Sequence, residues 1–135
     1  MISSPPPPQA LPAITVRAPR ARLHLQVAHT EEQRERGLMS VRALPPHTGM
    51  IFVFDRDAPV AFWMKDTLIP LDMVFVAQDG SVRRIFASVP VVSPRLPDAQ
   101  IPLEQGTAKF VIELPAGEAA KDGLLPGARI EGLPR

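Results

Sequence analysis

Side chains that could bind a ligand gather in one stretch of the chain, residues 60–77. Its charged residues are Lys65, Asp66 and Asp72, and they lie between strongly apolar runs beside the only tryptophan, Trp63. A charge within an apolar sequence costs free energy unless it is paired or solvated. These residues therefore need partners or a pocket, and we expect any functional site to lie here.

Asp72 is the most distinctive of these residues because it stands alone at the start of an apolar run. Burial favours the protonated form of a carboxyl group, whereas a nearby cation or backbone N–H donors favour the ionised form. Asp72 could be an acid that binds a ligand. It could equally be a structural carboxylate that fixes the loop at 67–70 or pairs with Lys65. We favour the structural interpretation, because structural networks also contain perturbed carboxylates.

The tripeptide Lys65-Asp66-Thr67 offers a cation, a carboxylate and a hydroxyl group in a row. Lysine can hold an anionic ligand as a point charge, although Asp66 and Thr67 are also typical turn residues. Trp63 could stack on a cation or a sugar, but it could also be part of the core. The candidate ligand-binding residues are therefore Trp63, Lys65, Asp66, Thr67 and Asp72.

Glu113 is a second lone acid, within the apolar run 110–114. If Asp72 and Glu113 occupied neighbouring strands, they could form a carboxylate pair like that of a glycosidase. A hydrolase-type enzyme using these two acids is therefore the alternative to a binding protein.

Other catalytic chemistry has little support in the sequence. There is no cysteine, and the three histidines (His24, His29 and His47) show no ligand spacing such as a helical i, i+4 pair. No nucleophile motif or phosphate-binding glycine loop occurs. We therefore predict no metal and no cofactor, and we favour a non-catalytic binding or accessory module that takes a small-molecule ligand.

The composition is that of one globular domain. The chain has 135 residues, of which 45% are hydrophobic and 21% charged, and its formal net charge is +1. This charge gives no global field for nucleic acid, and no apolar stretch is long enough for a membrane helix. We expect no nucleic-acid partner and no transmembrane segment in this chain. The sequence does not indicate an oligomeric state.

The N-terminal residues 1–13 are rich in proline and lack the pattern of a signal peptide. We expect them to form a disordered or semi-rigid leader ahead of a single β-rich domain at 14–135. The protein would be periplasmic or otherwise exported if a signal segment precedes this chain, and cytoplasmic if none does.

Hydrophobic periodicity predicts a mainly β domain. Period-two patterns and apolar runs indicate strands at 14–27 (interrupted near Pro19), 50–54, 60–65, 71–77, 82–86, 109–114 and 128–133. Residues 55–59 read as a turn and 88–106 as an irregular segment. A capping-box pattern at 30–33 predicts a helix over 30–37, and a helical turn is expected at 118–122. Together these elements predict a compact antiparallel barrel- or sandwich-like domain with two short helices.

Several motifs occur in an order that resembles one known family. They are residues 35–39 (Glu-Arg-Gly-Leu-Met), 49–54 (Gly-Met-Ile-Phe-Val-Phe), 62–67 (Phe-Trp-Met-Lys-Asp-Thr), 69–72 (Ile-Pro-Leu-Asp), 79–80 (Asp-Gly) and 113–117 (Glu-Leu-Pro-Ala-Gly). The chain is thereby identified, over about residues 22–131, as a member of the uncharacterised bacterial and archaeal family called domain of unknown function 192. The resemblance implies a small, mainly β domain, often behind a signal peptide or a membrane anchor, and it implies no particular activity.

Two positions depart from the pattern of this family. Asp66 stands where the family usually has asparagine, so an amide donor is replaced by a carboxylate. Val41 stands where an arginine often follows the Gly-Leu-Met motif, and Arg42 comes next. The resemblance therefore leaves the role of Asp66 open, and any role of that arginine does not transfer to Val41.

Overall fold

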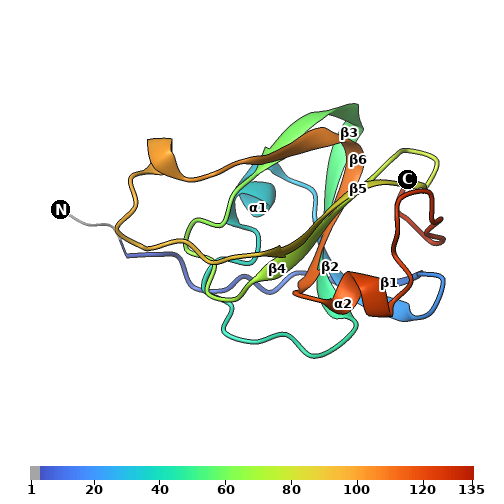
Figure 1. Cartoon of the computed structure of the whole chain (residues 1–135), viewed down its shortest axis with the longest axis horizontal. Coiled ribbons are helices and arrows are strands. Elements are labelled where there is room, and N and C mark those ends of the chain that lie inside the picture. The colour runs from blue at the N-terminus through green and yellow to red at the C-terminus, as the bar shows by residue number, and fades with distance from the viewer. Residues whose placement is uncertain (1–3) are drawn as a thin grey trace.

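One six-stranded sheet forms the framework of the protein (Figure 1). The computed structural model describes residues 4–135, and the first three residues of the predicted leader lie outside this range. The strands are β1 (Ala13–Arg17), β2 (Arg22–Ala28), β3 (Thr48–Phe62), β4 (Leu71–Val76), β5 (Val82–Val89) and β6 (Glu104–Pro115), in the spatial order β1-β2-β3-β6-β4-β5. The helices are α1 (Glu31–Arg36), α2 (Glu118–Lys121) and the short 3₁₀ helix η1 (Asp98–Gln100). The predicted mainly β fold with two short α-helices is confirmed. Within residues 4–135, no helix has the length and apolar character needed to cross a bilayer.

Helix α1 forms part of the crossover between the parallel strands β2 and β3. Parallel neighbours need a long connection, whereas the other neighbouring strands of this sheet are antiparallel. The predicted capping box is present: the Thr30 hydroxyl accepts a hydrogen bond from the Gln33 N–H (3.1 Å), and the Gln33 side chain accepts one from the Thr30 N–H (3.3 Å). Gly37 ends the helix with a φ of 48°, in the left-handed region that suits glycine.

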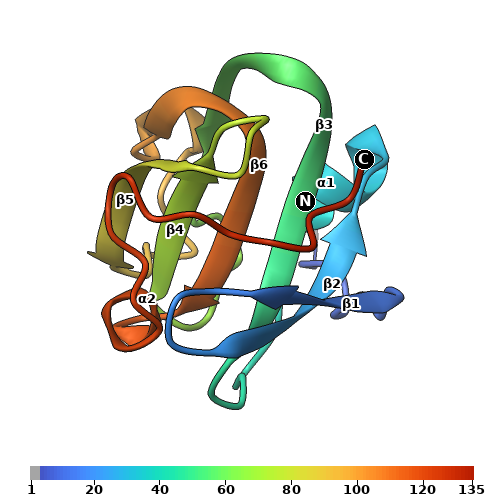
Figure 2. The same cartoon turned by 90° about the vertical axis from the view of Figure 1, so that its right-hand side faces the viewer.

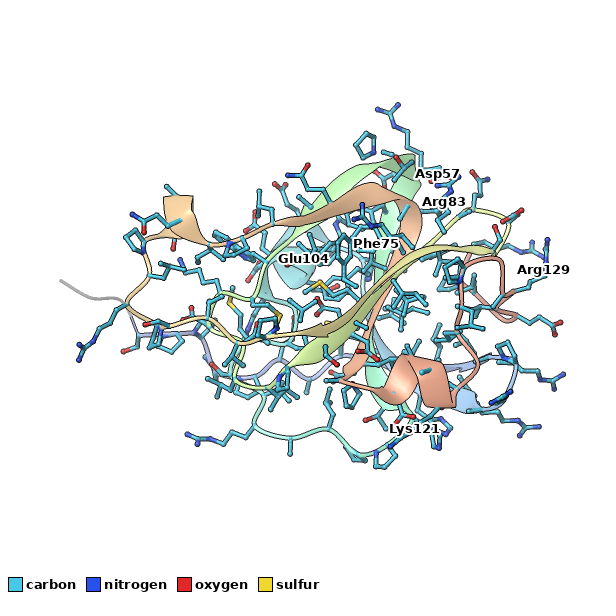
Figure 3. The ribbon with its side chains drawn as sticks, viewed as in Figure 1. Asp57, Phe75, Arg83, Glu104, Lys121 and Arg129 are labelled. Carbon is cyan, nitrogen blue, oxygen red and sulfur yellow. The ribbon has the colours of Figure 1, made fainter. Side chains whose placement is uncertain are left out.

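Strand β3 continues through the segment for which the sequence predicted a turn, so that prediction is wrong. Residues 55–59 lie within β3, and the register against β6 shifts between Val53 and Ala58. Asp57 and Arg83 lie side by side (Figure 3), and Arg83 Nη2 donates to Asp57 Oδ2 over 2.7 Å. The partner that helps to hold Asp57 in the sheet comes from β5, so no local pattern could reveal it. Residues 63–65, expected to extend a strand, follow the end of β3.

The C-terminal segment crosses the sheet from the side of β5 to the side of β1 and β2 (Figure 2). The sequence predicted a strand at 128–133, but this segment makes only isolated bridges. Glu131 bridges to Arg17, the last residue of β1, and Arg129 bridges to Ser81, just before β5. The edge strands β1 and β5 do not pair with each other. The sheet is therefore not closed into a barrel, whereas the sandwich-like alternative is compatible with the structure.

Each face of the sheet carries its own apolar core. The first contains Leu23, Leu25, Ile112 and Leu114, together with Ala119 of α2 and Ile130 of the C-terminal segment. The second contains Met50, Phe52, Phe62, Met73, Phe75 and Val111. Side chains alternate between faces along a strand, so Glu113, the neighbour of Ile112 and Leu114, points to the side of the second core.

The segment predicted to be irregular, 88–106, already contains the first residues of β6. Strand β6 begins at Glu104, and η1 lies within the remainder. A Cβ atom on Gly106 would come within 2.8 Å of the Phe75 ring. Glycine at this position therefore lets the ring, seen in the interior in Figure 3, lie directly against β6.

The described part of the proline-rich leader contacts α1 and its neighbours. Gln9 Nε2 donates to the carbonyl oxygens of Gln33 and Gly37, each over 2.9 Å. The Arg36 guanidinium donates to the carbonyl oxygen of Pro7, and the Leu11 side chain packs on the second core. The leader thus satisfies carbonyl groups at the C-terminal end of α1.

We expect Gln9→Ala to lower the free energy of unfolding by about 1–2 kcal/mol, because two hydrogen bonds to helix-end carbonyls are lost. Chemical denaturation of both proteins measures the change. Gln100→Ala is the matched control, since Gln100 is exposed and its side chain has no hydrogen-bond partner within residues 4–135. Equal stabilities of Gln9→Ala and wild type would show that the leader contributes nothing to the fold.

Candidate functional site

A cavity of about 710 Å³ lies between α1, β3 and the central strand β6. Small-molecule sites are typically clefts of about 300–1,000 Å³ with mostly apolar walls and a few polar groups. The lining residues are Glu31, Arg34, Glu35, Arg36, Gly37, Leu38, Met39, Phe52, Phe54, Ala61, Phe62, Trp63, Lys65, Thr67, Asp98 and Glu113. The size and the mixture of residues suit a small ligand.

Aromatic rings form much of the apolar wall. The centroids of Phe52 and Phe62 are 4.8 Å apart in an edge-to-face arrangement, and Phe54 lies 6.1 Å from Phe62. Edge-to-face pairs stabilise one another beyond their buried area. Because β3 supplies all three rings, this wall is fixed by the sheet itself.

Glu113 places a carboxyl group in this apolar surrounding. It lies between Met50 of β3 and Met73 of β4 in the sheet, and only 4% of it is exposed. Within residues 4–135 no group donates a hydrogen bond to its side chain. Burial, reinforced by the negative charge of Glu104, raises the pKa of Glu113 to about 8. The carboxyl group is therefore mostly protonated at neutral pH and can donate a hydrogen bond.

Glu104 is a second partly buried acid near Glu113 on the same strand. Burial also raises the pKa of Glu104. Its Oε2 atom is buried and has no hydrogen-bond partner in the described part of the chain. Two acids of raised pKa on one strand give this side of β6 a high affinity for protons or for another positive group.

The basic side chains of the cavity already have acceptors within the protein. Arg34 Nη1 donates to the Val53 carbonyl oxygen over 3.1 Å. Lys65 pairs with Asp98 over 2.8 Å, and this hydrogen bond raises the pKa of Lys65. The Lys65 ammonium also lies 5.4 Å from the centroid of the Trp63 ring. Arg36 likewise bonds to the leader, so all three cations are held in place, and the charge of Lys65 is also offset by Asp98.

The structure brings three of the predicted ligand-binding residues to the cavity, namely Trp63, Lys65 and Thr67. The Thr67 hydroxyl donates to the Lys65 carbonyl oxygen over 3.1 Å, which is the local turn contact weighed from the sequence. Thr67 therefore faces the cavity with its hydroxyl hydrogen already donated.

Asp66 is not part of the cavity wall and instead shapes the backbone. Its φ is 53°, in the left-handed region that asparagine and aspartate occupy more readily than most residues. Its carbonyl oxygen accepts a hydrogen bond from the Ser40 N–H over 2.9 Å. Asparagine and aspartate are both suited to this conformation, which accounts for their exchange at this position.

Asp72 lies on the opposite face of the sheet from the cavity. It pairs with Leu114, whereas Glu113 pairs with Met73, so the two acids point to opposite sides. Its carboxylate accepts hydrogen bonds from the N–H groups of Ser88 (2.8 Å), Gly117 (3.1 Å) and Ala119 (2.9 Å). Lys65 pairs with Asp98 instead of Asp72. The geometry therefore supports the structural interpretation of Asp72, and Asp72 and Glu113 do not face one common substrate.

Sequence reasoning did not identify the contribution of α1 to the cavity. Glu31, Arg34 and Glu35 all line it. Their spacing of i, i+3 and i+4 places them on one helical face, and this signal was available in the sequence. The direction of that face depends on how the crossover packs, which is a tertiary property.

The fold and the site define a small, mainly β domain with an open cavity next to a short crossover helix. The model of the family described as "Uncharacterized ACR", domain of unknown function 192 (DUF192), matches residues 13–132, and the chain belongs to this family. The resemblance drawn from the motifs is thereby confirmed.

Two solved structures show a similar fold. One is the crystal structure of a protein from Sinorhizobium meliloti 1021, described as a "putative transcription regulator", with 34% sequence identity and a TM-score of 0.81 over 92% of this chain and 96% of that one. The other is a protein of unknown function from Novosphingobium aromaticivorans DSM 12444, with 30% identity and a TM-score of 0.74 over 89% and 84%. No curated protein sequence matches this chain significantly.

We expect Asp72→Asn to lower the free energy of unfolding by about 1–3 kcal/mol, since an amide NH₂ must oppose one of the three N–H donors. Denaturant titration measures the loss. The double variant with Lys65→Met should show additive losses, because Lys65 does not pair with Asp72. A coupling energy above about 0.5 kcal/mol would contradict this arrangement.

The raised pKa of Glu113 predicts a pH-dependent stability. Below about pH 4.5 the carboxyl group is protonated in both the folded and the unfolded chain. As the pH rises towards 8, the unfolded chain loses this proton while the folded chain keeps it, so Glu113 makes the protein progressively less stable. Above about pH 8 both states are ionised and the effect no longer grows.

We therefore expect the stability of Glu113→Gln relative to wild type to increase with pH by about 1.4 kcal/mol per unit between pH 5 and 8. Denaturation at several pH values measures this difference. Glu32→Gln, at an exposed glutamate of α1 outside the cavity, should show no such trend. A pH-independent difference for Glu113→Gln would mean that the Glu113 carboxyl group ionises normally.

Proposed function

We propose that this domain is a non-catalytic binding module whose cavity takes a small, largely apolar molecule carrying a protonated amine. The observation that carries this proposal is the buried Glu113 carboxyl group, which has no hydrogen-bond partner among the described residues and faces an aromatic cavity. A buried polar group without a partner is costly. An amine that reached it would supply both the missing hydrogen bond and a compensating charge.

The charge distribution of the wall favours a cation over an anion. Arg34, Arg36 and Lys65 are each engaged by protein acceptors. Glu113 has no such counterpart, and Glu104 adds negative potential near it. The Phe52, Phe54 and Phe62 rings can also attract a cation through their faces.

Two other functions have less support. The hydrolase alternative required Asp72 and Glu113 on either side of one substrate, but their side chains point to opposite faces of the sheet. The relative from S. meliloti is described as a regulator of transcription. In this chain the formal net charge of +1 and the short helices of residues 4–135 favour a small-molecule ligand over direct contact with DNA.

A thermal-shift screen tests the proposal, using apolar primary amines with the alcohol and the carboxylic acid of the same skeleton. We expect amines to raise the melting temperature of wild type and the matched alcohols and acids to have little effect. The stabilisation should be lost in Glu113→Gln and weakened in Trp63→Ala, and it should persist in the control Glu32→Gln.

Calorimetry at several pH values provides a second readout. Because the amine needs the ionised carboxylate, binding should release a proton from Glu113 and tighten by up to tenfold per pH unit below pH 8. Stabilisation by amines that survives in Glu113→Gln would refute the proposed ligand chemistry. A preference for the acids over the amines would refute it as well.

A further inference from the structure

A second cluster of polar side chains lies on the other side of the sheet, where α2 meets the start of β3. His47 immediately precedes β3, Glu118 begins α2, and Asp122 follows it. Each of the three side chains offers one possible ligand atom, and these three atoms lie within 4.8 Å of one another. Glu118 and Asp122 have the i, i+4 spacing of one helical face, but His47 is far from both in the sequence, so the three-residue cluster could not be recognised from spacing. Helix α2, which carries the labelled Lys121 in Figure 3, packs on the first core through Ala119.

Two carboxylate oxygens in this cluster are buried without a partner. Glu118 is 6% exposed and Asp122 is 0% exposed. Glu118 Oε2 and Asp122 Oδ2 accept no hydrogen bond from any group within residues 4–135. Unsatisfied carboxylate oxygens at such burial are strongly unfavourable, so a positively charged partner would stabilise this part of the fold.

The His47 imidazole alone does not satisfy these oxygens. Its Nδ1 atom lies 2.9 Å from Asp122 Oδ1 and 3.5 Å from Glu118 Oε2. One Nδ1–H group can donate along one direction, towards Asp122 Oδ1, and this leaves the second oxygen of each carboxylate unpartnered. A metal ion at the centre would instead attract both carboxylates and accept the nitrogen lone pair.

The distances between the donor atoms suit a small divalent ion. Oxygen and nitrogen ligands lie about 2.0–2.2 Å from zinc, so two ligands of a tetrahedral ion are about 3.3–3.6 Å apart. The observed 2.9 Å and 3.5 Å bracket the lower end of this range. Both distances involve His47 Nδ1, and the three donor atoms all lie within 4.8 Å of one another, so a metal ion would draw the two carboxylate oxygens together.

The surrounding backbone holds these ligands in position. The His47 N–H donates to Glu118 Oε1 over 3.0 Å, and the His47 carbonyl oxygen accepts from the His24 N–H over 2.8 Å. Asp72 binds the N–H groups of Gly117 and Ala119, on either side of Glu118. The structural carboxylate of Asp72 thus fixes the turn that presents Glu118.

We propose that His47, Glu118 and Asp122 form a binding site for a divalent transition-metal ion, with zinc as the reference ion. Each residue supplies one ligand, and two carboxylates balance the charge of the ion. A set of one imidazole and two carboxylates suits zinc, cobalt or nickel, whereas calcium and magnesium prefer oxygen ligands alone. Because the His47 side chain is 47% exposed, a fourth position open to solvent can hold water.

Metal titration of untagged, chelator-treated protein at pH 7.5 tests the site. We expect one equivalent of Co²⁺ to produce visible absorption bands that Zn²⁺ removes, and Zn²⁺ to raise the melting temperature. His47→Ala should weaken Zn²⁺ binding at least about tenfold, since even a partner behind a metal ligand contributes about 10–100-fold. Asp122→Asn should weaken it similarly, and Mg²⁺ and Ca²⁺ should not compete.

The control His24→Ala removes a histidine outside the cluster and should bind Zn²⁺ within twofold of wild type. His47 is half exposed, so His47→Ala tests the site even if Asp122→Asn does not fold. In wild type, the ¹⁵N resonance of His47 Nδ1 should shift on addition of Zn²⁺. Absence of stoichiometric binding to wild type would overturn the proposal. Equal affinity in wild type and His47→Ala would also overturn it.

Discussion

The three hydrogen bonds of the Asp72 carboxylate join the end of β5 and the turn before α2 to strand β4, and the arrangement of this end of the domain builds on them. One reaches Ser88 near the end of β5, and two reach the turn between β6 and α2. The carboxylate is 1% exposed, so these N–H groups replace the water that it has lost. Two of these bonds help to position α2, together with the packing of Ala119 on the first core. Asp72, a candidate functional residue in the sequence, thus has structural contacts in the folded domain.

The sheet separates the two acids that the sequence made conspicuous, and each therefore has a different environment. Asp72 is surrounded by donors, whereas Glu113 is surrounded by methionine side chains and aromatic rings. Burial and the negative charge of Glu104 make ionisation of Glu113 unfavourable, and no group within residues 4–135 offsets that cost with a hydrogen bond. Stability and function commonly conflict at such positions, because a group prepared for a ligand is poorly satisfied without it. The cost of burying Glu113 and the size of the cavity are the two features on which the proposed binding function rests.

The parts of the fold that sequence reasoning predicted are those encoded locally. The helix at 30–37 followed from its capping box, and the lone acids Asp72 and Glu113 were recognisable in apolar strands. The continuation of β3 through Asp57 depended on Arg83, and the face on which Glu113 lies depended on the register with β4. The cluster of His47 with Glu118 and Asp122 is formed only when the start of β3 meets α2. Pairings between distant segments decide these features, and no local pattern records them.

The bridge between Arg17 and Glu131 also has a consequence for the order in which the chain can fold during translation. The ribosome synthesises the edge strand β1 long before Glu131, the residue that bridges to the last residue of β1, Arg17. The first core also includes Leu124 and Ile130 of the C-terminal segment. Contacts of such long sequence separation slow folding, and an uncovered strand edge invites pairing with other chains. Until the C-terminal segment has been synthesised, the end of β1 therefore lacks this bridge and its edge stays open to pairing with other chains.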